Sequence, residues 1–174
     1  VRDPEVFLLD EPLSNLDALL REQVRAQMKQ LFKDQNKPVV YVTHDQTEAM
    51  TLSTKVAVLN QGMIQQLDPP SRIYSHPANE FVASFVGSPQ MNLLNLRCEG
   101  DFAILGPYEL RLPDLNFKPA NIILGIRPED VTLAANEKNE AINMMGTAYL
   151  VEQLGKENLV SMKIGDSDKT IRAL

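Results

Sequence analysis

The stretch VFLLDEPLSNLD, residues 6–17, constrains the fold of this chain more than any other segment. Its four apolar residues, Val6 to Leu9, predict a short strand buried on both faces, as in a parallel sheet, although periodicity alone leaves a buried helix open. Two carboxylates, Asp10 and Glu11, follow the strand directly. Open α/β sheets bind ligands at the carboxyl ends of their strands, where carboxylates also suit a hard cation. Asp10 and Glu11 are therefore candidate functional residues.

The next segment predicts a helix and a second strand. After a tight turn at residues 12–15, either Ser14 or Asp17 can cap a helix that ends near residues 36–38. The apolar positions of this helix fall on one face: Leu20, Val24, Met28, Leu31 and Phe32. Residues 39–43 are β-branched or aromatic and predict a second buried strand, which His44 follows.

A short helix at residues 45–52, a third strand at 55–59 and a hairpin into 63–67 complete the predicted order β-α-β-α-β-β. Right-handed crossovers would make the first three strands neighbours in one parallel sheet. We then expect Asp10, Glu11 and His44 to converge at one edge of that sheet.

The composition changes after residue 68. Residues 68–92 contain four prolines and two short helical patterns, at 70–74 and 79–86, which predict a bridge between two domains. From Leu93 onward, short apolar runs such as ANIILGI and NLVSMKI alternate with turn residues, and this pattern predicts small antiparallel β structure. We expect an α/β domain at 1–90 and a β-rich domain at 91–174 that is truncated. The acidic cluster at residues 137–140 predicts a solvated loop.

Charge and cysteine content restrict the classes of partner and compartment. The chain has 23 acidic and 17 basic residues and a net charge of -6, which argues against nucleic acid or an anionic membrane as the main partner. Cys98 is the single cysteine, so no intrachain disulfide is possible and a reducing, cytosolic setting is the simplest expectation. Nothing before Val6 resembles a natural amino terminus, so we expect a piece of a longer protein.

Three motifs in order resemble the catalytic half of ABC-transporter ATPases. Residues 6–11 resemble a Walker B motif, residues 14–17 (SNLD) resemble the D-loop that follows it, and residues 43–45 (THD) resemble the switch-histidine loop. The resemblance narrows with further motifs across nearly the whole chain: HDQTEAM at 44–50, GMIQQ at 62–66, GSPQMN at 87–92 and GIRPEDV at 125–131. Together they resemble the ATP-binding subunits of carbohydrate-type ABC importers, the maltose and glycerol-phosphate group, with a carboxyl-terminal TOBE (transport-associated OB) domain.

This resemblance implies a fold and a role for each candidate residue. The expected fold is the carboxyl-terminal part of a P-loop NTPase parallel sheet with its helices, plus a small OB/TOBE-like β domain. Asp10 would hold Mg²⁺ through a water molecule, and Glu11 would orient and polarise the attacking water. His44 would contact the γ-phosphate of ATP, and Asp17 would reach across a sandwich dimer.

The resemblance also implies partners. These are a second copy of the subunit and the transmembrane permease subunits of an importer, with no nucleic acid. The location would be cytoplasmic, peripheral on the inner face of the membrane. ATP hydrolysis would drive uptake of a solute, with sugars favoured by the motifs of the second domain.

The chain departs from this family in motifs that it lacks. It has no Walker A sequence G-x-x-x-x-G-K-[ST], whose backbone amides and lysine cradle the phosphates, and it has neither a Q-loop nor an LSGGQ signature. We therefore expect the isolated chain neither to bind ATP tightly nor to hydrolyse it. With the missing strands, neighbouring strand edges would be unpaired, so we also expect the isolated chain to oligomerise.

Other functions stay open at this point. The β domain could be a non-catalytic dimerisation or regulatory module. The ABC-like ATPases of DNA repair share the three motifs, but they insert long coiled coils, and this sequence shows none. Oxyanion binding by the β domain, as in molybdate or sulfate importers, has no clear site in the sequence.

Overall fold

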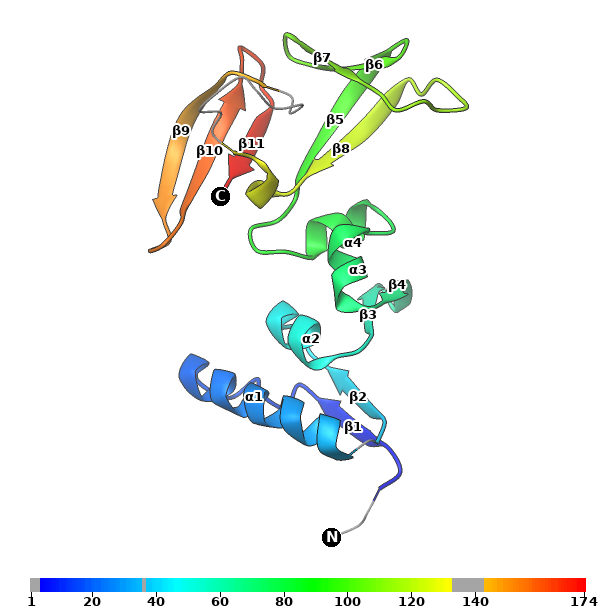
Figure 1. The fold of residues 1–174 in the computed structure, drawn as a ribbon, viewed down its shortest axis with the longest axis vertical. Helices are drawn as coiled ribbons and strands as arrows, with labels where there is room; N and C mark the ends of the chain where they lie inside the picture. Colours follow the sequence, from blue (N-terminus) through cyan, green and yellow to red (C-terminus); the bar gives the residue numbers. More distant parts are fainter. Residues whose placement is uncertain (1–3, 36, 133–142) are drawn as a thin grey trace. The chain divides into compact units, whose positions relative to one another are not determined.

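The structure, a computed structural model, describes residues 4–35, 37–132 and 143–174 (Figure 1). The chain forms two compact units, Val1–Val82 and Ala83–Leu174. The predicted boundary between domains, at residues 90 and 91, stays a prediction. The acidic cluster at residues 137–140 lies outside the described residues.

The first unit begins with a β-α-β element, as the sequence predicted. Strands β1 (Phe7–Asp10) and β2 (Val39–Val42) are parallel, and helix α1 (Ala18–Gln35) connects them. Phe7 is in register with Val39, and Asp10 with Val42, so the two strands end level with each other. The aromatic rings of Phe32 and Tyr41 meet edge to face with centroids 6.5 Å apart, which packs α1 against β2.

The two faces of this small sheet differ in their burial. Tyr41 and its neighbours on the face toward α1 are half-buried. On the opposite face, the side chains of Leu8, Val40 and Val42 are 76%, 53% and 52% exposed. The prediction of a strand buried on both faces is wrong for this chain, because the described residues place a covering layer on one face alone.

The remaining elements of the first unit are α2 (Gln46–Leu52), β3 (Val56–Asn60), β4 (Met63–Asp68) and α3 (Pro70–Ser75), and α4 (Glu80–Phe85) follows them. The predicted hairpin is confirmed, since β3 and β4 are antiparallel and join through Gln61 and Gly62. Both turn residues have positive φ, +50° and +76°, as a tight hairpin turn requires.

The prediction that the third strand extends the parallel sheet is wrong. In the described residues, β3 hydrogen-bonds with β4 in a separate two-stranded sheet, and β2 bonds with β1. A two-residue turn lets β3 find a partner locally, at a smaller cost in loop-closure entropy than pairing with a more distant strand.

The second unit consists of two antiparallel sheets, which confirms the predicted β-rich, OB/TOBE-like domain. One sheet has the strand order β7-β6-β5-β8. Its strands are β5 (Asn92–Glu99), β6 (Phe102–Leu105), β7 (Tyr108–Arg111) and β8 (Asn121–Ile126). A short 3₁₀ turn, η1 (Pro128–Asp130), follows β8. The other sheet has the order β11-β10-β9, with β9 (Gly146–Gln153), β10 (Asn158–Ile164) and β11 (Thr170–Ala173).

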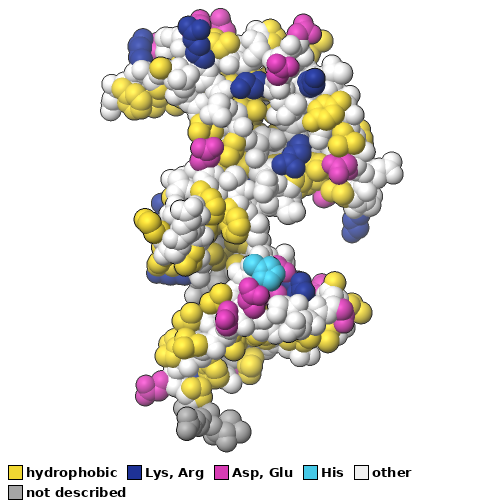
Figure 2. Space-filling view, turned by 180° about the vertical axis from the view of Figure 1, so that it is seen from behind, with side chains coloured by type: hydrophobic (Ala, Val, Ile, Leu, Met, Phe, Trp, Pro, Cys, Tyr) yellow, Lys and Arg dark blue, Asp and Glu magenta, His cyan; other side chains and the backbone are white. Residues whose placement is uncertain are grey.

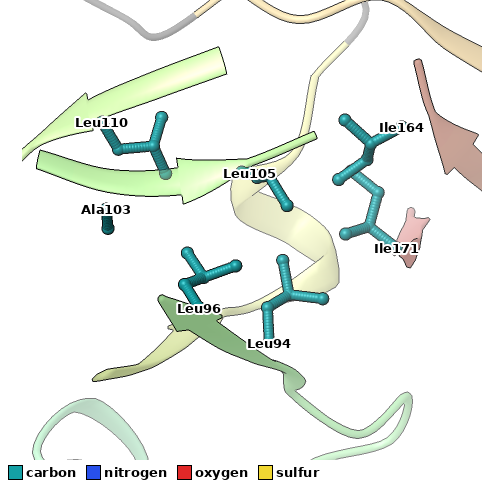
Figure 3. Close-up of a cluster of buried hydrophobic side chains, with 7 residues drawn as sticks. All are labelled: Leu94, Leu96, Ala103, Leu105, Leu110, Ile164 and Ile171. Carbon is teal, nitrogen blue, oxygen red and sulfur yellow. The ribbon is translucent and has the colours of Figure 1, made fainter. Parts of the chain in front are cut away.

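The core of the second unit lies between its two sheets (Figure 3). The larger sheet contributes Leu94, Leu96, Ala103, Leu105 and Leu110, and the smaller sheet contributes Ile164 and Ile171. The buried side chain of Asn92 joins the sheets with hydrogen bonds, because its Nδ2 donates to the carbonyl oxygens of Ile126 and Arg172 at 3.1 and 2.9 Å. Its Oδ1 accepts from the backbone N–H of Arg172 at 2.7 Å.

Candidate functional site

Glu11 lies directly after β1 in an unusual backbone conformation. Its φ is +42°, in the left-handed region that non-glycine residues rarely adopt. Its N–H donates to the Val42 carbonyl oxygen at 2.9 Å, and its own carbonyl oxygen accepts from the backbone N–H of Ser14 at 3.2 Å. The Ser14 hydroxyl donates to the same oxygen at 2.9 Å. A strained residue held by its surroundings in this way is typical of functional sites.

The structure brings Glu11 and His44 together. Because β1 and β2 end level with each other, the residues that follow each strand are neighbours at one edge of the sheet. His44 Nδ1 lies 3.0 Å from Glu11 Oε1, within hydrogen-bond distance. The His44 side chain is 74% exposed and that of Glu11 is 45% exposed, so both are accessible to a ligand.

The carboxylate changes the ionisation of the imidazole. The hydrogen bond that the Glu11 carboxylate accepts, and then the negative charge of Glu11, raises the pKa of His44 above 6.5, and the carboxylates of Asp45 and Glu48 contribute in the same direction. Desolvation opposes the shift. His44 therefore keeps its proton to a higher pH than an ordinary histidine, and a protonated imidazole can donate a strong hydrogen bond to a phosphate oxygen.

The other two predicted site residues, Asp10 and Asp17, are both exposed. Asp10 is the last residue of β1 and is exposed, so its carboxylate is accessible at the same edge of the sheet. Asp17 is also exposed, and its Oδ1 accepts from the backbone N–H of Leu20 at 3.0 Å. Asp17, not Ser14, is thus the residue that caps α1.

Neither a complete metal cage nor a membrane span is visible in the described part of the chain. Within residues 4–35, 37–132 and 143–174, no group of three or more His, Cys, Asp or Glu side chains has a geometry that could hold a metal ion. Among the same residues, no helix is both long enough and apolar enough to cross a membrane.

Sequence reasoning missed one residue of this region, Glu48. Its side chain is 3% exposed, and its Oε2 accepts hydrogen bonds from the hydroxyls of Tyr41 and Thr43 at 2.9 and 2.8 Å. Burial and the contact with Glu48 raise the pKa of Tyr41. The signal in the sequence was a glutamate inside a short helix four residues after His44, but its burial depends on tertiary packing that the local pattern does not show.

Comparison with known proteins assigns a family model to the second unit. The model described as the MalK OB fold domain matches residues 87–131. The match covers the strands of the larger sheet and the 3₁₀ turn after them.

Curated proteins match almost the whole chain. A trehalose/maltose import ATP-binding protein from Thermococcus litoralis is 43% identical over 95% of this chain and 48% of its own length. Glycerol-3-phosphate import ATP-binding proteins from Roseobacter denitrificans and Vibrio vulnificus are 45% and 44% identical, over 92% and 97% of this chain and 43% and 46% of their own lengths. The chain thus spans about half the length of the curated relatives that it matches.

Proposed function

We propose that this chain is the part of an ATP-binding subunit that carries the hydrolytic residues, because it belongs to the ATP-binding subunits of the maltose and glycerol-phosphate group of ABC importers. The whole subunit would couple ATP hydrolysis to import of a solute, most simply a sugar or a sugar-like compound. The observation that carries this proposal is the 3.0 Å contact between Glu11 and His44 at the carboxyl ends of two parallel strands.

Glu11 and His44 would divide the chemistry between them. The Glu11 carboxylate accepts a hydrogen bond from the attacking water and takes its proton as the oxygen approaches phosphorus. Protonated His44 donates to an oxygen of the γ-phosphate and stabilises negative charge there. Because the two side chains contact each other, binding of a phosphate by His44 also changes the surroundings of Glu11.

Asp10 is suited to hold Mg²⁺. Its exposed carboxylate lies at the end of β1 beside Glu11, and carboxylate oxygens together with water are the ligands that Mg²⁺ prefers. The fit requires only one protein carboxylate, because Mg²⁺ in such sites keeps several waters and shares phosphate oxygens. When bound, the ion would neutralise charge on the phosphates during transfer.

Asp17 and the partners of the subunit follow from the family. We propose that a second copy of the subunit packs against the D-loop, where Asp17 is exposed and already ordered by its bond to Leu20. The proposed permease partners place the subunit on the cytoplasmic side of the membrane. The D-loop role of Asp17 adds to its capping of α1, since a carboxylate has lone pairs beyond the one that Leu20 uses.

The proposal is tested with Glu11→Gln in the full-length subunit. We expect ATP still to bind while turnover falls about 10² to 10⁴-fold, the range of a general base. Glu22→Gln is the matched control, because Glu22 is an exposed glutamate on α1 that the mechanism does not use. Turnover of Glu11→Gln near the parental rate would show that Glu11 is not the base.

A second function is favoured by the surface of β9. Every residue of this strand is exposed, including Tyr149, Leu150 and Val151, and β9 is at the edge of its sheet. Exposed apolar edge strands pair readily with other chains, so the second unit would also serve in dimerisation. Val151→Lys in the full-length subunit should then weaken the dimer in light scattering. An unchanged dimer would exclude this surface.

A further inference from the structure

Glu48 is a buried carboxylate that the proposed mechanism does not use. Only 3% of the residue is exposed, although it lies on a short helix of seven residues. Burying a carboxylate is costly unless it is hydrogen-bonded, and such a group is seldom retained without a role. Its Oε2 accepts from two hydroxyl groups, those of Tyr41 in β2 and Thr43 just after β2.

Thr43 links Glu48 to the two residues that flank His44, because its hydroxyl bonds both to Glu48 and to the backbone N–H of Asp45. The Thr43 hydroxyl donates to Glu48 Oε2 at 2.8 Å and accepts from the backbone N–H of Asp45 at 3.0 Å. The hydroxyl therefore closes a short turn, residues 43–45, with His44 at its apex; we call this turn the His44 loop. A hydroxyl that both donates and accepts has a fixed orientation, so Glu48 determines how this turn is held.

The carboxyl side of the His44 loop is anchored to the same helix. Asp45 Oδ1 accepts from the backbone N–H groups of Thr47 and Glu48 at 2.7 and 3.2 Å, which caps α2. Asp45 Oδ2 lies 3.5 Å from Nη1 of Arg21, whose Nη2 donates to the Leu16 carbonyl oxygen at 3.0 Å. The His44 loop is thus attached to α2 and to the start of α1.

We propose that Glu48 is a positioning residue for His44: through Thr43 it fixes the His44 loop so that the exposed imidazole is held against Glu11. The inference rests on the proposed function, because it assigns Glu48 a role in the same site. The His44 side chain is 74% exposed, and its contact with Glu11 restrains it directly. Its orientation therefore depends on the backbone that carries it.

Two variants of this network test the proposal in the full-length subunit. Glu48→Ala removes the acceptor for both hydroxyls, and Thr43→Val removes the bridging hydroxyl with almost no change in side-chain volume. If the first variant fails to fold, the second still decides the question. We expect kcat to fall, by up to about 10²-fold for a displacement near 1 Å, with little change in KM for ATP. Thr43→Ser, which retains the hydroxyl, should restore turnover.

Control variants separate positioning from general destabilisation. Thr51→Val removes a threonine hydroxyl from α2, the helix that carries Glu48; among the described residues, this hydroxyl bonds only to backbone carbonyls of α2. Glu22→Gln changes an exposed glutamate on α1. Both should turn over at the parental rate, and thermal unfolding should show whether Thr43→Val leaves the fold intact. Equal losses in Thr43→Val and Thr51→Val would overturn the proposal.

The pKa of His44 provides a readout that a purely structural role would not change. Glu11 raises this pKa through a contact at 3.0 Å, so moving His44 away from Glu11 should lower it toward 6.5. The charged groups facing His44 are Glu11, Asp45 and Glu48, and Thr43→Val alters none of their charges. We expect its histidine NMR titration to shift to lower pH and that of Thr43→Ser to stay at the parental pH.

The outcomes distinguish this proposal from the proposed function. Parental turnover and an unchanged His44 titration in Thr43→Val would overturn the positioning role while leaving the function intact. Reduced turnover with an unchanged titration would also overturn it, because His44 would not have moved. If Glu11→Gln or His44→Ala left turnover unchanged, the proposed function would fail, and the His44 titration would still decide whether Glu48 positions His44.

Discussion

The side chain of Glu11 is suited to catalysis, but the backbone conformation of Glu11 is energetically unfavourable for a glutamate. Its φ of +42° is costly for any residue with a Cβ atom, by roughly 1 to 2 kcal/mol, and glycine avoids that cost. We therefore expect Glu11→Gly to be more stable than Glu11→Ala by about 1 kcal/mol, although both should be inactive. Denaturant unfolding of the full-length subunit measures the difference. Equal stabilities would mean that this turn stores no strain.

The contact between His44 and Glu11 predicts a dependence of stability on pH. Because the folded-state pKa of His44 is raised above 6.5, its contribution to stability is present below that pH. The contribution is lost as the pH rises through the raised pKa. Glu11→Gln should remove this part of the pH profile and return the pKa of His44 toward 6.5, which NMR titration measures. A pKa that does not change in Glu11→Gln would contradict the assigned cause.

Single-residue placement was predictable where it follows from strand register. Asp10 ends one strand, Glu11 follows it directly and His44 comes shortly after the next strand, so parallel pairing alone brings Glu11 and His44 to one edge. The role of Glu48 was not predictable, because its burial depends on hydroxyl groups from a different element. The catalytic roles of Glu11 and His44, and the cofactor-binding roles of Asp10 and Asp17, stay predictions.

At the scale of elements, α1 depends on its cap as well as on partial burial. None of the eighteen described residues of α1 is fully buried, so its apolar stripe contributes only partly. Asp17 Oδ1 satisfies the N–H of Leu20 at 3.0 Å. Asp17→Ala should therefore lower the free energy of unfolding by about 1 kcal/mol, whereas Asp17→Asn keeps a capping oxygen and should cost less.

The same pair of variants separates the two roles of Asp17. Unfolding measurements on the full-length subunit report the cap, and ATP turnover reports any contribution across a dimer. If Asp17→Asn kept its stability but lost turnover, the charge would matter for more than capping. If Asp17→Ala unfolded at the parental denaturant concentration, the cap would be energetically unimportant.

The order of elements was predictable, but the way the sheets divide was not. Helix periodicity, the Gln61-Gly62 turn and the β-branched run at residues 39–43 are local signals, and the structure confirms the elements that they predict. Whether β3 joins β1 and β2 depends on pairing between distant segments, for which one sequence holds little information. The exposure of the face that includes Leu8 could not be predicted for the same reason, because an apolar run in the sequence does not indicate how many faces of the strand will be covered.

The surface of the first unit bears on the behaviour of the whole molecule. Figure 2 shows hydrophobic side chains at the surface, with a histidine beside acidic side chains. The exposed apolar residues of the β1–β2 sheet include Leu8, Val40 and Val42, and Leu8 is directly opposite Val40 in the register. An exposed apolar face of this kind is available for association.

We therefore expect the isolated 174-residue chain to self-associate through the β1–β2 sheet. Leu8→Lys together with Val40→Lys places two like charges on that face and should return the chain to a monomer in light scattering. Phe117→Lys is the matched control, because Phe117 is 67% exposed in the second unit and belongs to neither strand. If the control dissociated the chain equally well, association would depend on overall charge. A monomeric parental chain would show instead that the exposed face does not drive pairing, despite the 76% exposure of Leu8.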